Sequence, residues 1–123
     1  MDVLRLCWLG IPTEQYEPMV RLLRDVMGLR VEFERPTTTE LSTASGDRVQ
    51  VFAPDDPYFE LFRRHGNGPV ALFEIDDLDA ARRELSAAGI EVIGANERDS
   101  QWEWLHFRGP DGNLYAAGVR SSL

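Results

Sequence analysis

The chain has 123 residues, 43% of them hydrophobic, which is enough for one compact domain with a buried core. Its 13 basic and 21 acidic side chains give a formal net charge of -8. This charge disfavours binding to nucleic acid or to an anionic membrane, because phosphate contacts need basic patches. No apolar run is long enough to span a bilayer, and Asp2 and Arg5 interrupt the N-terminal apolar residues, so we expect no signal peptide and a cytoplasmic location.

The first half of the chain predicts one strand, one helix and three further strands. Residues 4–11 are typical of a buried strand, and Thr13 is the expected N-cap of a helix that ends at Gly28. The helix carries apolar side chains at a 3.6-residue period, namely Tyr16, Met19, Val20, Leu23, Val26 and Met27. Three strands follow at 29–33, 38–44 and 48–52, with a turn at 45–47.

The second half repeats this order. A strand at 70–75 precedes a helix that begins at Asp76 or Asp77 and ends at Gly89, with Leu78, Ala81, Leu85 and Ala88 on its apolar face. Strands at 90–93, 101–107 and 114–119 complete it. Residues 53–67 link the halves, and Asp55-Asp56-Pro57 predicts a short helix there. We therefore expect an α+β fold and a single domain over 1–123, with two tandem β-α-β-β-β units at about 1–52 and 68–123.

The stretch from Phe107 to Ala117 carries the most specific signal. Its Pro110-Asp111-Gly112-Asn113 lies between two apolar runs and is typical of a hairpin turn. This hairpin, the junctions at 27–29 and 73–79, and the tandem order resemble the vicinal oxygen chelate superfamily. That superfamily includes glyoxalase I, extradiol dioxygenases, fosfomycin-resistance enzymes and bleomycin-resistance proteins. The resemblance covers nearly the whole chain, and it implies a mixed sheet curled around a cleft and a homodimer.

The resemblance also places the metal ligands of the family. Carried onto this chain, they fall at Leu6, Gln50, Val70 and Ala116. Only Gln50 has an atom that could bind a metal, since the other three side chains are hydrocarbon. We therefore predict a member of the family that lacks the metal site, with no metal and no other cofactor.

Alternation along the strands assigns side chains to the two faces of the sheet. It places Cys7 and Phe73 beneath the helices, and it turns Leu6 toward the cleft. The residues expected to line the cleft and bind a ligand are Trp8, Glu40, Arg48, Gln50, Glu74, Trp102, Trp104 and His106.

Trp102 and Trp104 lie two residues apart, so they form a platform for a flat or cationic ligand, with Glu40 and Glu74 as counter-charges. The alternative is that the tryptophans only fill the space between the two halves of the sheet. For His106 the sequence shows no orienting partner, because Glu103 lies on the opposite face, and a packing role is the alternative to a base.

Three functions fit these features. The first is metal-independent binding of a small molecule in the cleft of a homodimer, which resembles the bleomycin-resistance branch of the family. Those proteins are acidic, lack the metal site and sequester a cationic drug. The second is a lyase, an isomerase or a dioxygenase-like enzyme with a relocated site at Glu40, Glu74 and His106. The third is a structural or regulatory module whose cleft is unused.

Overall fold

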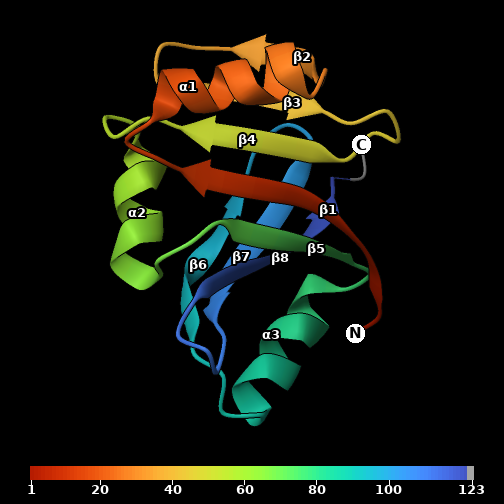
Figure 1. Cartoon of the computed structure of the whole chain (residues 1–123). Coiled ribbons are helices and arrows are strands. Elements are labelled where there is room, and N and C mark those ends of the chain that lie inside the picture. The colour runs from red at the N-terminus through yellow and green to blue at the C-terminus, as the bar shows by residue number, and fades with distance from the viewer. Residues whose placement is uncertain (122–123) are drawn as a thin grey trace.

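The computed structural model describes residues 1–121, and it confirms the predicted order of elements (Figure 1). The first unit contains β1 (Val3–Pro12), α1 (Tyr16–Arg21), the π-helical turn η1 (Leu22–Val26), β2 (Arg30–Glu34), β3 (Thr38–Ser42) and β4 (Arg48–Phe52). The linker forms α2 (Pro57–His65). The second unit contains β5 (Val70–Ile75), α3 (Leu78–Ala87), β6 (Val92–Arg98), β7 (Trp102–Arg108) and β8 (Leu114–Arg120). None of the helices within 1–121 has the length and apolar character needed to span a membrane.

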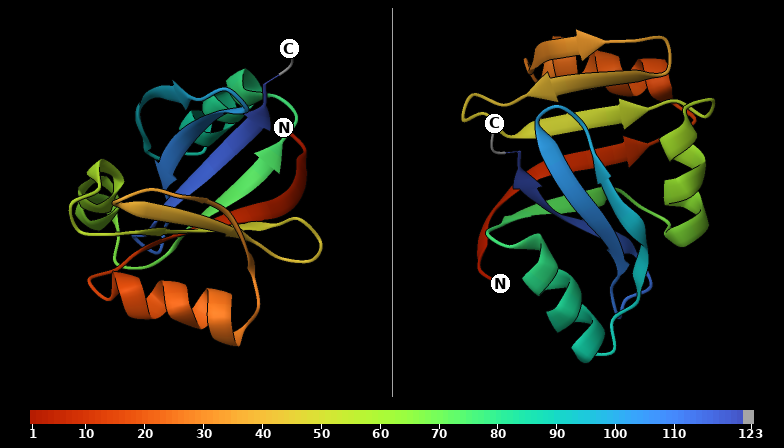
Figure 2. Two further views of the ribbon diagram at one scale, coloured as in Figure 1. Left: turned by 90° about the horizontal axis from the view of Figure 1, so that it is seen from above. Right: turned by 180° about the vertical axis from the view of Figure 1, so that it is seen from behind.

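All the strands form one mixed sheet of eight strands in the order β2-β3-β4-β1-β5-β8-β7-β6. Within each unit the first strand pairs in parallel with the last, and the units join through the antiparallel pair β1–β5. The sheet curls without closing into a barrel, so that β6 and β7 lie in front of β1 and β5 when the molecule is seen from behind (Figure 2). We call the inner side of this curl the concave face, and the side that carries α1 and α3 the outer face.

Each outer helix covers one hydrophobic cluster. Beneath α1 and η1 the buried side chains are Val20, Leu23, Leu41 and Val51. Beneath α3 they are Ile75, Leu78, Ala81, Leu105 and Ala117. Apolar burial of this kind supplies most of the stability of the two units.

The first helix departs from its predicted course at both ends. Thr13 is not its N-cap: the helix begins at Tyr16, and the Thr13 hydroxyl accepts a hydrogen bond from the Gln15 amide at 2.9 Å. Near its end the chain widens into η1, which shifts the side chains that follow out of the 3.6-residue period. Val26 and Met27 are therefore 77% and 60% exposed, and their predicted burial is wrong. Gly28 ends the helix with φ 76°, as predicted.

A bulge in β1 changes two predicted orientations. Leu6 pairs with Phe73 and Trp8 pairs with Leu72, so Cys7 is the additional residue between them. The Cys7 side chain consequently packs in the cluster on the concave face and not beneath the outer helix. Leu6 lies on the outer face, where it is 56% exposed, so its predicted place in the cleft is also wrong.

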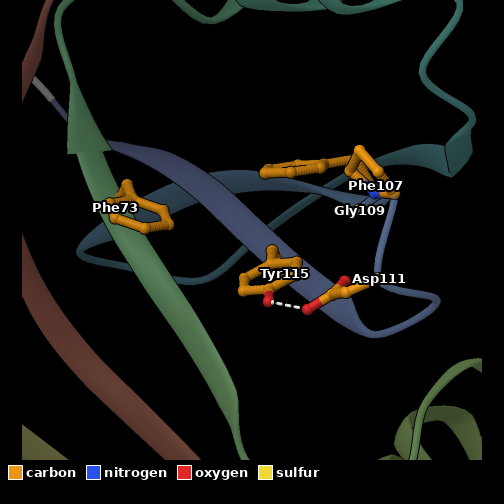
Figure 3. Close-up of a pocket in the computed structure, with 6 residues that line it drawn as sticks. Phe73, Phe107, Gly109, Asp111 and Tyr115 are labelled. Carbon is orange, nitrogen blue, oxygen red and sulfur yellow. Dashed lines mark hydrogen bonds between the residues drawn. The ribbon is translucent and has the colours of Figure 1, made fainter.

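Phe73 is only partly buried, in contrast to its predicted place beneath α3. It lines a hollow of about 370 Å³ on the outer face together with Phe107, Asp111 and Tyr115 (Figure 3). Ile75, two residues later on the same face, takes the buried position under the helix.

The linker helix α2 has the predicted start. Pro57 is its first residue, and the Asp56 side chain accepts a hydrogen bond from the Tyr58 amide at 2.9 Å. The helix lies beside the ends of β1 and β4 (Figure 1). Its Phe62 is 2% exposed and packs on the concave face, so α2 closes one end of that face.

Candidate functional site

The concave face carries the predicted site residues in two groups. The first group, Trp8, Glu40, Arg48 and Gln50, comes from β1, β3 and β4. The second group, Glu74, Trp102, Trp104 and His106, comes from β5 and β7. Phe62 of α2 connects the groups, because its ring lies edge-on to Trp8 at 6.4 Å and edge-on to His106 at 5.9 Å.

A chain of hydrogen bonds fixes the middle of the first group. The Trp8 indole donates to Gln50 Oε1 at 3.3 Å, and Gln50 Nε2 donates to Thr38 Oγ1 at 3.0 Å. Thr38 in turn donates to the Val51 carbonyl at 2.8 Å. The amide of Gln50 is therefore held between Trp8 and Thr38, and its orientation leaves the Trp8 ring packed against the aromatic cluster.

An arginine neutralises the acidic side chains beyond Gln50. Arg48 Nη1 donates to Glu40 Oε2 at 2.7 Å, and its Nη2 lies 3.8 Å from Glu32. The Glu40 side chain is 13% exposed. Burial raises the pKa of Glu40, and the hydrogen bond from Arg48 opposes that rise. Glu40 is thus not a free counter-charge for a ligand, because Arg48 already occupies it.

Two arginines hold the second carboxylate, Glu74. Arg5 Nε donates to Glu74 Oε1 at 3.0 Å, and Arg120 Nε lies 3.4 Å from Glu74 Oε2. The Arg120 guanidinium also lies over the Trp102 ring, 4.7 Å from its centre. The Glu74 side chain is 14% exposed, whereas that of Arg120 is 58% exposed. The partners Arg5 and Arg120 were not singled out by sequence reasoning, and Arg120 could have been found from its place opposite Trp102 in the β7–β8 pair.

Aromatic side chains fill part of the concave face, from α2 to β7. Trp8, Trp102 and Trp104 are partly buried and pack against a buried cluster that includes Phe52 and Phe62. Some of the tryptophan surface therefore belongs to the core of the molecule. This packing is the alternative that the sequence left open, and it restricts the platform for a ligand to the part of each ring that remains accessible.

His106 has the orienting partner that the sequence did not show. Its Nδ1 lies 3.3 Å from Glu97 Oε2, and the Tyr58 hydroxyl donates to the other oxygen of Glu97 at 2.7 Å. Burial lowers the pKa of His106 and Glu97 opposes this effect, while burial and Glu97 together raise the pKa of Tyr58. The imidazole is only 5% exposed on its side chain, whereas Glu97 is 35% exposed.

The four family metal positions do not come together as a donor set. Val70 and Ala116 are 1% exposed and lie in the hydrophobic cluster, Leu6 lies on the outer face, and Gln50 is bonded to Trp8. No group of three or more His, Cys, Asp or Glu side chains within residues 1–121 is arranged to hold a metal ion. The donor chemistry therefore does not fit the metal of the family at these positions.

The comparisons with known proteins agree with this architecture. A family model described as the Glyoxalase/Bleomycin resistance protein/Dioxygenase superfamily matches residues 5–116. The chain belongs to this superfamily. A comparison with curated proteins gave no significant match.

Solved structures of the superfamily share the fold at low identity. A member from Vibrio splendidus 12B01 is 21% identical with a TM-score of 0.70, covering 95% of this chain and 98% of its own. Methylmalonyl-CoA epimerase from Mycobacterium tuberculosis is 19% identical with a TM-score of 0.76, and the match covers 98% of this chain and 90% of the epimerase. The Mn(II)-bound glyoxalase from Novosphingobium aromaticivorans is 18% identical with a TM-score of 0.74, and the match covers 98% of this chain but 41% of that protein.

Proposed function

We propose that the protein binds a small planar aromatic or cationic molecule on the concave face, at Trp102 and Glu74, without a metal. The observation that supports this proposal is the position of Arg120. Its guanidinium is itself a planar cation, and it stacks on Trp102 while it pairs with Glu74. The Arg120 guanidinium therefore lies between the face of an aromatic ring, Trp102, and a carboxylate, Glu74, and a flat cationic ligand needs the same two partners.

The exposure of Arg120 makes an exchange with a ligand feasible. Since 58% of its side chain is exposed, the guanidinium can move into water at small cost, because exposed ion pairs contribute little. Glu74 is far less exposed and would remain in place with Arg5 beside it. A ligand that displaces Arg120 would gain the stacking surface of Trp102 and the accessible edge of Trp104.

We also propose that this binding protein is a cytoplasmic homodimer. Its lone cysteine, Cys7, is a free and buried thiol, which suits a reducing compartment. Leu4 and Leu6 on the central strand β1 are 58% and 56% exposed, and they offer apolar area to a second copy.

A ligand panel tests the proposal directly. The metal content of the purified protein is first determined by elemental analysis. Calorimetry then follows its melting temperature as a planar aromatic cation, a neutral analogue or an anionic analogue is added. The cation should raise the melting temperature with its concentration. Glu74→Gln should weaken binding of the cation more than binding of the neutral analogue, and Trp104→Ala should weaken binding of both.

Arg120→Ala provides the sharpest arm of this test. It should raise the affinity for the cation, because the competing internal guanidinium is gone. Arg98→Ala is the matched control, since Arg98 pairs with Glu103, whose side chain lies on the opposite face of β7 from Trp102. The absence of any shift, a preference for the anion, or one divalent metal ion per chain in elemental analysis would contradict the proposal. An absent shift would leave the concave face without a ligand, as in a structural module.

A second candidate is an acid–base enzyme with a relocated site, which the His106–Glu97 contact favours. A neutral imidazole oriented by a carboxylate can accept a proton from carbon. One of the similar solved structures is a methylmalonyl-CoA epimerase, so methylmalonyl-CoA is the natural probe. Exchange of its α-proton in deuterated water, observed by NMR and lost in His106→Asn, would support an isomerase. Exchange at the uncatalysed rate would exclude this reaction.

A further inference from the structure

A second pocket lies where the end of α2 meets the hairpin between β7 and β8, at the opposite end of β7 from Trp102. Its volume is about 310 Å³, and its lining includes Arg63, Arg64, His65, Asn67 and Arg108. These side chains form a basic group on a chain whose formal net charge is -8.

The walls of this basic pocket are held together by direct contacts. Gly66 lies so close to β8 that a Cβ at this position would stand 2.9 Å from the Leu114 backbone nitrogen. Beside it, the Asn67 amide donates to the Asn113 side chain at 3.4 Å. The loop after α2 therefore rests on the hairpin, and the pocket is part of the folded structure.

The positive charge in the pocket exceeds what the helix requires. Basic residues at the end of a helix compensate a partial charge of about half a unit, and this is the simplest explanation for Arg63 and Arg64. Arg108 adds a third guanidinium from another element. The nearby carboxylates, Glu60 and Glu91, are 77% and 61% exposed, so water screens their attraction for Arg64 and Arg108.

Arg108 and His65 form a hydrogen bond with each other, and each retains a donor for which residues 1–121 provide no hydrogen-bond acceptor. Arg108 Nη2 lies 2.7 Å from His65 Nδ1, and because a guanidinium can only donate, Nδ1 must accept. The His65 proton then lies on Nε2, which is a donor. Arg108 Nε is buried and has no hydrogen-bond partner among the described residues. A pocket lined by several hydrogen-bond donors, with one guanidinium N–H that lacks a partner, is complementary to a compact group rich in acceptors.

We propose that this pocket binds a phosphate group, either free or as the phosphate of a monoester. Phosphate offers several acceptor oxygens to guanidinium groups, and arginine binds it through paired, charge-assisted hydrogen bonds. The site is separate from Trp102 and Glu74, so it does not depend on the function proposed for the concave face.

Titration with inorganic phosphate and with phenyl phosphate tests this proposal. Calorimetry and ³¹P NMR are carried out on the full chain at constant ionic strength, with chloride as the reference anion. Both ligands should bind, and the amide signals of Gly66, Asn67 and Gly112 should shift. Arg64→Gln should weaken binding by about tenfold, as expected for the loss of one charge-assisted hydrogen bond.

Arg83→Gln is the matched control. It removes one exposed arginine from α3, changes the net charge equally and lies outside the pocket. Tighter binding of phenyl phosphate would identify a monoester as the ligand, and equal binding would identify free phosphate. The proposal fails if phosphate has no more effect than chloride, or if Arg64→Gln and Arg83→Gln weaken binding equally.

Discussion

Leu23 is enclosed between the first helix and the sheet. It is 5% exposed and packs with Val20, Leu41 and Val51. Phe73 lies at the rim of the hollow on the outer face, beside Phe107 and Tyr115 (Figure 3). Burial, and not the size of the side chain alone, decides how much of each side chain leaves water on folding.

Replacing these two residues should therefore have different effects on stability. Leu23→Ala should lower the free energy of unfolding by about 2–5 kcal/mol, because the surrounding side chains cannot fill the cavity. Phe73→Ala should cost clearly less, since its neighbourhood is already open to water. Urea unfolding of both variants measures the difference. An equal or larger loss for Phe73→Ala would show that the hollow is closed in solution.

At the scale of the elements, the short linker helix α2 contacts the concave-face residues of both units. Its Phe62 packs between Trp8 and His106, and its Tyr58 donates to Glu97. The helix thus contributes to the burial of the candidate base and to the packing of the tryptophans. The stability of α2 should therefore affect the concave face as a whole.

The N-cap of α2 provides a test of this connection. Asp56 is 8% exposed, and besides the Tyr58 amide it accepts a hydrogen bond from the Thr37 hydroxyl at 2.7 Å. The Asp77 side chain, the N-cap of α3, accepts a hydrogen bond from the Ala80 amide at 3.0 Å and has no second donor among residues 1–121. Asp56→Ala should cost about 2 kcal/mol or more, and Asp77→Ala about 1 kcal/mol.

Amide hydrogen exchange measures the effect of these two substitutions locally, in addition to their effect on the free energy of unfolding. Asp56→Ala should speed exchange in α2 and increase the exposure of the Trp8 indole, whereas Asp77→Ala should leave both unchanged. Similar losses of stability for the two variants, with no change in the exchange of α2, would show that the Thr37 contact adds nothing.

The order of elements was predictable because local chemistry determines it. Gly28 and Gly89 end their helices with positive φ, and Asp56-Pro57 begins α2. The superfamily and the tandem architecture followed from these signals. Apart from Phe73, the misplaced side chains lie where regular periodicity stops, at η1 and at the bulge around Cys7. Such insertions are set by packing between distant segments, so a pattern of two or 3.6 residues cannot show them.

The contact between Glu97 and His106 was missed for a similar reason. Their strands are paired, but the register of β6 against β7 shifts between Ile93 and Glu97, near Gly94 with its φ of 72°. The alternation of side chains along β6 or β7 therefore does not predict that Glu97 and His106 are in contact. The contact of Arg120 with Glu74 likewise depends on the sheet order, which brings β1, β5 and β8 together, whereas its place opposite Trp102 follows from the β7–β8 hairpin.

For the whole molecule, an uncovered apolar part of the outer face lies at the beginning of β1. Leu4 and Leu6 belong to the part of β1 that pairs with β5 but precedes the pairing with β4, which begins at Trp8, and both side chains are more than half exposed. Exposed apolar side chains that lie next to one another are typical of protein interfaces, so a second copy of the chain is a suitable cover. Electrostatics opposes this association, because each copy carries a formal charge of -8.

We therefore predict a homodimer that becomes tighter as salt is added, since screening reduces the repulsion while apolar contact persists. Leu6→Lys should convert the dimer to monomers without lowering the stability of the monomer, because the side chain is 56% exposed there. Ser86→Lys, on the exposed surface of α3, adds the same charge and should leave the dimer intact. Sedimentation velocity over a range of protein and salt concentrations measures both effects. A wild-type protein that remains monomeric at high concentration and high salt, or a Ser86→Lys variant that dissociates as readily as Leu6→Lys, would contradict an interface at β1.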